Sequence, residues 1–158
     1  MSEIPLREVW VLHGPNLNLL GTREPAIYGT VTLPEIDADL QARGSALGVR
    51  VVAYQTNHEG VLMDWIQAAV VQKVDALLIN PAAFTHTSIG LRDALSVFEG
   101  VKVEVHLSNI ASREEFRQQS FVSGVVDAVV SGFGPDSYRL ALQGAISILR
   151  KRLQEGSR

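Results

Sequence analysis

The chain has 158 residues and no cysteine, and 46% of its residues are hydrophobic while 20% are charged. These values are typical of a single globular domain, and they exclude a collagen-like chain, a disulfide scaffold, a thiolate metal site and a cysteine nucleophile. A formal charge of −3 argues against a nucleic-acid partner, and the lack of any apolar run of roughly 18 residues argues against a membrane span. Because residues 1–8 also lack an apolar leader segment, we expect a cytoplasmic location.

Five short runs of apolar and β-branched residues predict β-strands. In chain order, the strands are expected at residues 9–12, 49–54, 76–79, 101–107 and 128–131. Segments with helical periodicity separate and follow them, and helices are expected to begin near residues 32, 60, 87, 112 and 135. Capping boxes mark the starts of two helices, at Thr32 and Ser112, and the first helix is expected to bury Ile36, Leu40 and Leu47 on one face.

The alternation of strands and helices predicts the fold class. Helices of this size between strands form βαβ units, which build a parallel sheet with both faces covered. No repeat, low-complexity stretch or linker divides the chain, so we expect one catalytic domain over residues 1–158. We therefore predict a doubly wound α/β domain of flavodoxin-like type, with five parallel strands.

Polar residues gather where the predicted strands end. The carboxyl ends of parallel strands meet at one edge of the sheet, and ligands of doubly wound folds bind there. All four histidines lie at or just beyond strand ends: His13, His58, His86 and His106. This placement predicts a polar site at that edge.

The loop from about Gly14 to Val31 is longer than the two to six residues usual for such a connection. It suggests a lid hinged at Gly21 and Gly29 that carries Arg23 and Tyr28. A packed surface loop explains the same composition equally well.

The residue types at this edge favour acid–base chemistry. The three lysines lie on predicted helix or strand bodies, which argues against a Schiff base, and no phosphate loop or metal-ligand spacing is present. Tyr28 could act as a base if nearby cations such as Arg23 lowered the pKa of its hydroxyl. His106 lies two residues after Glu104 on one strand face, an arrangement that suits a carboxylate-oriented general acid. The structural alternatives are a turn residue at position 28 and a buried core histidine at position 106.

Five segments in order carry a resemblance to a known family: HGPNLNLLGTREPAIYG at 13–29, QTNHEG at 55–60, NPAAFTHTS at 80–88, EVHLSN at 104–109 and REEFR at 113–117. Together they closely resemble type II 3-dehydroquinate dehydratase. The resemblance runs from about Val9 to Leu142, nearly the whole chain.

The resemblance implies a reversible loss of water from 3-dehydroquinate to give 3-dehydroshikimate, without a metal or an organic cofactor. Tyr28 would take a proton from the carbon beside the ketone, and Arg23 would support its anionic form. Asn16 would help to hold a water that stabilises the enolate. His106, paired with Glu104, would protonate the departing hydroxyl.

The resemblance also implies a set of substrate contacts and an assembly. The positions that would bind the substrate are Asn80, His86, Leu107 through its backbone, Ser108, Arg117 and, from a neighbouring subunit, Asp93. Members of the family are typically homododecamers built as four trimers. The sequence does not decide between aromatic biosynthesis and quinate breakdown, because both use this reaction.

Several positions depart from the pattern of the family. His13 stands where asparagine is commoner, and its role is open between substrate-side polarity and loop hydrogen bonding. Ala82 replaces a usual glycine and Phe84 a usual tyrosine, while Asp127 and Ser137 also differ from the pattern. We therefore expect altered backbone geometry near Ala82 and altered packing around the last strand.

A non-catalytic binding module of the same fold is the alternative from another class. A receiver domain would need an acidic pair after the first strand, an aspartate after the third and a lysine after the fifth. The chain has His13 and Asn16, Asn80 and no lysine at these places. An imine-dependent or metal-dependent lyase is a further enzymatic alternative.

Overall fold

The sheet has five strands, all parallel, in the order β2-β1-β3-β4-β5. The computed structural model describes residues 7–22 and 25–156, without the side chains at positions 27 and 28. The strands are β1 (Arg7–His13), β2 (Val49–Gln55), β3 (Ala76–Asn80), β4 (Val101–His106) and β5 (Ala128–Ser131). This order confirms the predicted flavodoxin-like sheet, and its direction of winding reverses between β1 and β3.

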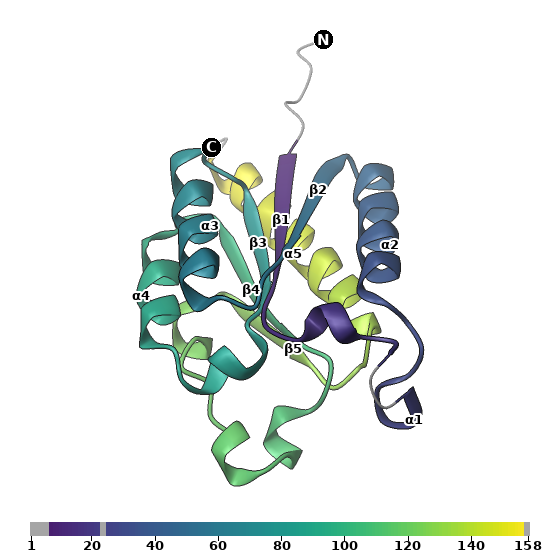
Figure 1. Ribbon diagram of the computed structural model, residues 1–158. Helices are drawn as coiled ribbons and strands as arrows, with labels where there is room; N and C mark the ends of the chain where they lie inside the picture. Colours follow the sequence, from purple (N-terminus) through teal and green to yellow (C-terminus); the bar gives the residue numbers. More distant parts are fainter. Residues whose placement is uncertain (1–6, 23–24, 157–158) are drawn as a thin grey trace.

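Helices cover both faces of the sheet (Figure 1). α3 (Glu59–Val71) and α4 (Ile89–Val97) lie on one face, and α2 (Leu33–Ala46) and α5 (Asp136–Gly156) lie on the other. The chain also forms the single turn α1 (Pro25–Tyr28) and short 3-10 turns in its loops: η1 (Leu17–Leu19), η2 (Ala82–His86), η3 (Ile110–Ser112), η4 (Glu115–Arg117) and η5 (Ser123–Val125).

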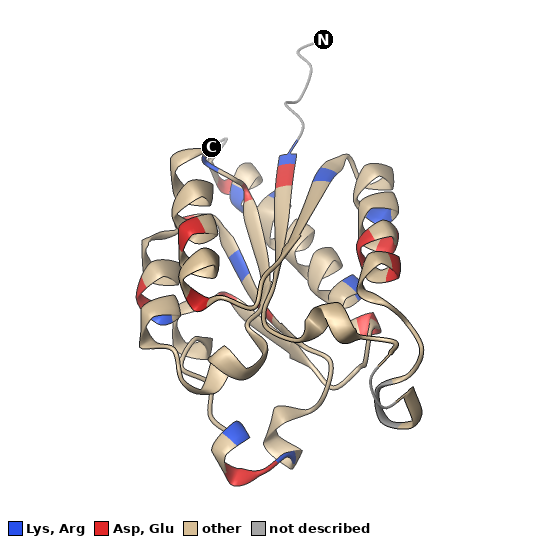
Figure 2. Cartoon of the chain, viewed as in Figure 1, with Lys and Arg blue, Asp and Glu red and all other residues tan. Residues whose placement is uncertain are grey.

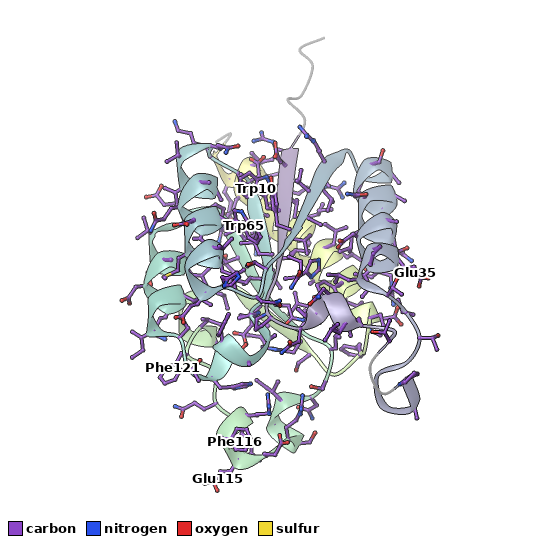
Figure 3. All side chains as sticks on the ribbon, viewed as in Figure 1. Trp10, Glu35, Trp65, Glu115, Phe116 and Phe121 are labelled. Atoms are coloured by element: carbon purple, nitrogen blue, oxygen red, sulfur yellow. The ribbon has the colours of Figure 1, made fainter. Side chains whose placement is uncertain are left out.

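The two faces of the sheet build separate hydrophobic layers because successive strand residues point in opposite directions. In β1, Val9 and Val11 pack with α2 and α5, while Trp10 and Leu12 pack with α3 and α4. Tyr54 lies 5.2 Å from Trp10 and 5.1 Å from Trp65 of α3, measured between ring centroids, and so extends the second layer toward α3. Figure 3 labels the two tryptophans. Both helical layers are therefore fixed by the strand pattern.

Local signals place most helix starts correctly. The capping box at Thr32 is present, because the Glu35 amide donates to Thr32 Oγ1 and the Thr32 amide donates to the Glu35 carboxylate, both at 3.3 Å. Ser88 caps α4, since its Oγ accepts the Leu91 amide at 3.0 Å.

Two expectations about the helices were wrong. The capping box expected at Ser112 is absent, because its hydroxyl donates to the Asn109 carbonyl, and the short helix expected after it is the 3-10 turn η4. Leu47 does not share the buried face of α2, because the helix ends at Ala46 and Leu47 is left 39% exposed.

The register brings the strand ends to one edge of the sheet. His13 pairs with Asn80 across β1 and β3, and His106 pairs with Ser131 across β4 and β5. In Figure 1, α1 and the η3–η4 segment project from this end of the molecule. Loops far apart in sequence therefore surround one space.

Over residues 7–22 and 25–156, no helix combines the length and the apolar character needed to cross a bilayer.

Two glycines inside helices give opposite predictions. A Cβ added to Gly44 would lie 2.5 Å from a methyl of Val51, so Gly44→Ala should lower the free energy of unfolding by about 1–3 kcal/mol through overpacking. A Cβ added to Gly144 would meet nothing within 4 Å. Gly144→Ala should therefore raise the free energy of unfolding by about 0.5–1 kcal/mol, because glycine loses more backbone entropy on folding. Urea denaturation of the two variants measures both effects, and shifts of the same sign would contradict the packing described.

Candidate active site

A cavity of about 280 Å³ lies at the carboxyl ends of β1, β3 and β4. Three connections supply its walls, and it opens at the point where the winding of the sheet reverses, as expected for this fold. Its lining residues are Pro15, Asn16, Leu17, Leu19, Leu20, Asn80, Ala82, Ala83, His86, His106, Leu107, Ser108, Ile110, Arg113 and Arg117. Seven of the predicted site residues, Asn16 among them, therefore line one cavity.

His106 and Glu104 form a buried pair on β4. They lie on the same face of the strand, and His106 Nε2 is hydrogen bonded to Glu104 Oε2. The Glu104 residue is fully buried, whereas His106 also lines the cavity. Among the described residues, Nδ1 of His106 has no hydrogen-bond partner, so this nitrogen is available to a ligand.

Two serines hold the other oxygen of the Glu104 carboxylate. Ser123 Oγ donates to Oε1 at 2.7 Å and Ser120 Oγ donates to it at 3.1 Å. Burial alone would raise the pKa of the Glu104 carboxyl, but the hydrogen bonds from His106, Ser123 and Ser120 lower that pKa below its ordinary value. The pair thus presents an ionised carboxylate to the imidazole at neutral pH.

Sequence reasoning missed Ser120 and Ser123. They lie in an irregular segment around η5, where no periodicity places them near β4. The available signal was indirect: a glutamate in the middle of a buried strand needs hydrogen-bond donors from elsewhere in the chain.

Two arginines give the cavity a positive wall. Arg113 and Arg117 both line it, and both lie near Glu114, with Arg117 Nε 3.1 Å from Oε2. Arg113 Nη1 also donates to Ser108 Oγ at 3.4 Å. Figure 2 shows these opposite charges together at the end of the η3–η4 segment, and Figure 3 shows Phe116 at its tip. Because both guanidinium groups line the cavity and no carboxylate of the described residues does, this wall suits an anionic group of a ligand.

The third-strand connection contributes two polar side chains with fixed orientation. His86 Nδ1 donates to the Gln119 carbonyl at 2.8 Å, which leaves Nε2 for the cavity. Asn80 Oδ1 accepts the Ala82 amide at 3.1 Å. Ala82 has a positive φ of 51°, a conformation that favours the glycine usual at this position.

The first connection lies directly against the third. The Gly14 amide donates to the Asn80 carbonyl at 2.8 Å, and a Cβ added to Gly14 would lie 2.5 Å from the Pro81 carbonyl oxygen. Asn16 follows in a left-handed conformation with φ 68°, and its backbone N–H donates to Asn57 Oδ1 at 3.0 Å. Asn16 is thereby placed at the mouth of the cavity.

For three predicted residues, Arg23, Tyr28 and Asp93, the described structure shows no contact with the cavity. Arg23 and the Tyr28 side chain lie outside the described residues. Gly21 and Gly29, the proposed hinges around them, both have positive φ values, of 83° and 79°. Asp93 lies exposed on α4 and does not line the cavity of its own chain. The predicted roles of Tyr28, Arg23 and Asp93 remain predictions.

His13 and Asp127 show what two departures from the family pattern do. His13 is fully buried, does not line the cavity, and is hydrogen bonded to Asp37 and Tyr138, which favours the hydrogen-bonding role over substrate contact. Asp127 accepts the Lys102 amide and pairs with Arg152 at 2.6 Å beside β5.

Among residues 7–22 and 25–156, no set of three or more His, Asp or Glu side chains could hold a metal ion. The expectation of catalysis without a cofactor remains a prediction.

Comparison with known proteins tests the resemblance. The model of the family "Dehydroquinase class II" matches residues 7–146. A protein of Bordetella avium named 3-dehydroquinate dehydratase is 51% identical over 140 residues, which cover 89% of this chain and 97% of that protein. A protein of Trichodesmium erythraeum with the same name is 51% identical over 147 residues, or 93% and 97% of the two chains.

A solved structure leads to the same family. The type II dehydroquinase of Propionibacterium acnes superposes with a TM-score of 0.83 at 44% identity, covering 87% of this chain and 94% of that one. The predicted resemblance and fold are therefore confirmed, and with them the expectation of an enzyme. The family model spans every strand of the sheet and all of the described cavity, so this chain belongs to the class II dehydroquinase family.

Proposed function

We propose that this chain is a 3-dehydroquinate dehydratase that eliminates water reversibly through an enolate. The observation that carries the proposal is the buried Glu104–His106 pair, whose histidine lines a small cavity together with Arg113 and Arg117. This arrangement provides a proton donor and an anion-binding wall within one space. Membership of the class II dehydroquinase family supports the same reaction.

The first half of the reaction is removal of a proton. In our proposal, the Tyr28 phenolate takes a proton from the carbon beside the substrate ketone, and the electron pair of that bond forms the enolate. Arg23 stabilises the phenolate, because a nearby cation favours the charged form. Asn16, at the mouth of the cavity, helps to hold a water against the enolate oxygen.

The second half is loss of the hydroxyl. The enolate returns its electron pair, the carbon–oxygen bond breaks, and His106 gives its proton to the leaving hydroxyl so that water departs. Glu104 orients the ring through Nε2, so the proton comes from Nδ1, the nitrogen that is free to contact a ligand. The ionised Glu104 carboxylate also lies against the ring that gives up this proton.

Substrate binding uses the remaining polar residues of the cavity. Arg117 and Ser108, with the Leu107 backbone, bind the substrate carboxylate in our proposal. Asn80 and His86 bind its hydroxyl groups. All of these residues line the same cavity as His106.

We also propose that the active site is completed in a homododecamer of four trimers. Asp93 would reach the cavity of a neighbouring subunit. Ile89 and Val97, four residues to either side of Asp93, are 58% and 63% exposed, so this face of α4 is apolar around the carboxylate.

A cytoplasmic location, with a role in aromatic biosynthesis or in quinate breakdown, accords with a small-molecule substrate.

Conversion of 3-dehydroquinate tests the proposed function. The product is a conjugated enone, so the purified chain should produce a rising ultraviolet absorbance without added metal or cofactor. No rise at high enzyme concentration would favour a non-catalytic binding module. Loss of activity on chelation, or trapping by borohydride with substrate present, would favour the alternative lyases.

Tyr28→Phe tests the base. We expect kcat to fall by about 10²–10⁴-fold with little change in KM, because the lost hydroxyl acts only in proton transfer. Tyr54→Phe, in the aromatic cluster away from the cavity, is the matched control and should keep normal kinetics. Near-normal turnover in Tyr28→Phe would assign the base to another residue.

Arg117→Ala tests the carboxylate contact. We expect KM to rise by about 10–100-fold while kcat changes less, because a charge-assisted hydrogen bond of about 1.5–3 kcal/mol is lost in the bound substrate. Arg139→Ala is the control, since Arg139 pairs with Asp136 on α5 outside this cavity. An unchanged KM in Arg117→Ala would remove Arg117 from the binding site.

Glu104→Gln tests the buried carboxylate through pH. Because the pKa of Glu104 is lowered in the fold, its contribution to stability is present above its ordinary pKa and is lost as the pH falls through the lowered value. The variant should therefore unfold more easily than the wild type at pH 7, by about 2 kcal/mol. This gap should narrow in acid. Urea denaturation at pH 7 and in the acid range measures the gap, and a pH-independent difference would contradict the ionised pair.

A further inference from the structure

A chain of hydrogen bonds crosses the molecule behind the cavity. Asp37 Oδ1 on α2 lies 2.7 Å from His13 Nε2, and His13 Nδ1 lies 2.9 Å from Tyr138 Oη at the start of α5. Asn80 Nδ2, at the end of β3, lies 3.0 Å from the same Tyr138 oxygen. His13, Tyr138 and Asn80 are buried, so the loss of one of these hydrogen bonds would leave a polar group without a partner and would cost free energy.

The direction of each bond follows from the proton on Tyr138. Burial raises the pKa of the Tyr138 hydroxyl above its ordinary value, so the group keeps its proton at neutral pH. The Asn80 amide nitrogen can only donate to Oη. Among the described residues, the other partner of Oη is His13 Nδ1, so the hydroxyl can place its own proton in a hydrogen bond only there. We therefore take Nδ1 as the unprotonated ring nitrogen.

This assignment sets the tautomer of His13. With Nδ1 as acceptor, the ring carries its proton on Nε2, which donates to Asp37 Oδ1. A carboxylate at Nε2 favours this tautomer, in the way that outer partners fix ligating or catalytic imidazoles. Asp37 thus acts on Tyr138 through the ring.

The other end of the chain fixes the amide of Asn80. A backbone amide can only donate, so the Asn80 atom facing the Ala82 amide is Oδ1. Rotating the amide by half a turn would set Nδ2 against the Ala82 donor and lose the contact with Tyr138. One hydrogen of Nδ2 is used by Tyr138, and the second remains for the cavity, which Asn80 lines.

We propose that Asp37, His13 and Tyr138 are positioning residues that hold the Asn80 amide with one N–H directed at a substrate oxygen. This inference rests on the proposed function, because it assigns Asn80 a hydroxyl group of the substrate as its partner. The three residues touch no substrate themselves. Their effect is on binding, and so on KM more than on kcat.

Tyr138→Phe removes one oxygen from the chain and is the main test. We expect KM to rise about tenfold, the effect of one hydrogen bond, with kcat within about twofold of the wild type. The same substitution is then made in an Asn80→Ala background. There it should have no further effect on KM, because the residue that it positions is gone. An unchanged KM in Tyr138→Phe, or equal effects in both backgrounds, would overturn the proposal.

Asp37 and Asp39 provide a matched pair on α2. Asp39 pairs with Arg43 on the surface, whereas Asp37 contacts His13. Asp37→Ala should raise KM severalfold, Asp37→Asn should restore it because its amide oxygen still accepts from Nε2, and Asp39→Ala should keep it normal. Equal KM values for Asp37→Ala and Asp39→Ala would contradict the role of Asp37.

A measurement without substrate separates this proposal from the proposed function. Nitrogen-15 chemical shifts of the His13 ring, assigned by their loss in His13→Gln, should show protonation on Nε2 and a bare Nδ1. Protonation on Nδ1 would overturn the chain of bonds even in an active enzyme. If the wild type does not convert 3-dehydroquinate, the proposed function fails, and the ring spectra still decide the orientation of the chain.

Discussion

The structure depends on a carboxylate that has been taken out of water. Glu104 is fully buried in the middle of a parallel sheet, where an unpaired charge costs several kcal/mol. Its two oxygens are instead bound by His106 on one side and by Ser120 and Ser123 on the other. The same carboxylate therefore orients the imidazole at the cavity and ties the segment around η5 to the sheet. A site that needed only an exposed acid would not have required this enclosure.

The sheet order explains how few residues are needed to build the site. Each parallel strand delivers its last side chain to one edge, so His13, Asn80 and His106 arrive together although they are far apart in sequence. Because successive side chains of a strand point to opposite faces, these residues do not all come from the same face of the sheet. His106 comes from the face covered by α3 and α4, and Asn80 comes from the face covered by α2 and α5. The cavity is thus supported by hydrogen bonds in both layers, Glu104 in one and Tyr138 in the other.

The sequence predicted what depends on local patterns. Apolar runs located the five strands to within a few residues, the histidines at strand ends pointed to the correct edge, and Thr32 marked the start of α2. Features that depend on distant contacts were missed. Nothing near Ser120 or Ser123 in the chain indicates Glu104 as their acceptor, and nothing near Asp37 indicates His13. Ser112 had the pattern of a helix cap, but its hydroxyl donates to the Asn109 carbonyl within the preceding turn η3 instead. The family pattern supplied roles for Tyr28 and Arg23, which residue types alone had left open.

The close approach of Gly14 to Pro81 has a mechanical consequence. With no room for even a methyl group between them, and with the Gly14 amide bound to the Asn80 carbonyl, the first and third connections move as one block. The contact thus ties together two walls of the cavity, because Pro15 and Asn16 line it on one side of the contact and Asn80 and Ala82 on the other.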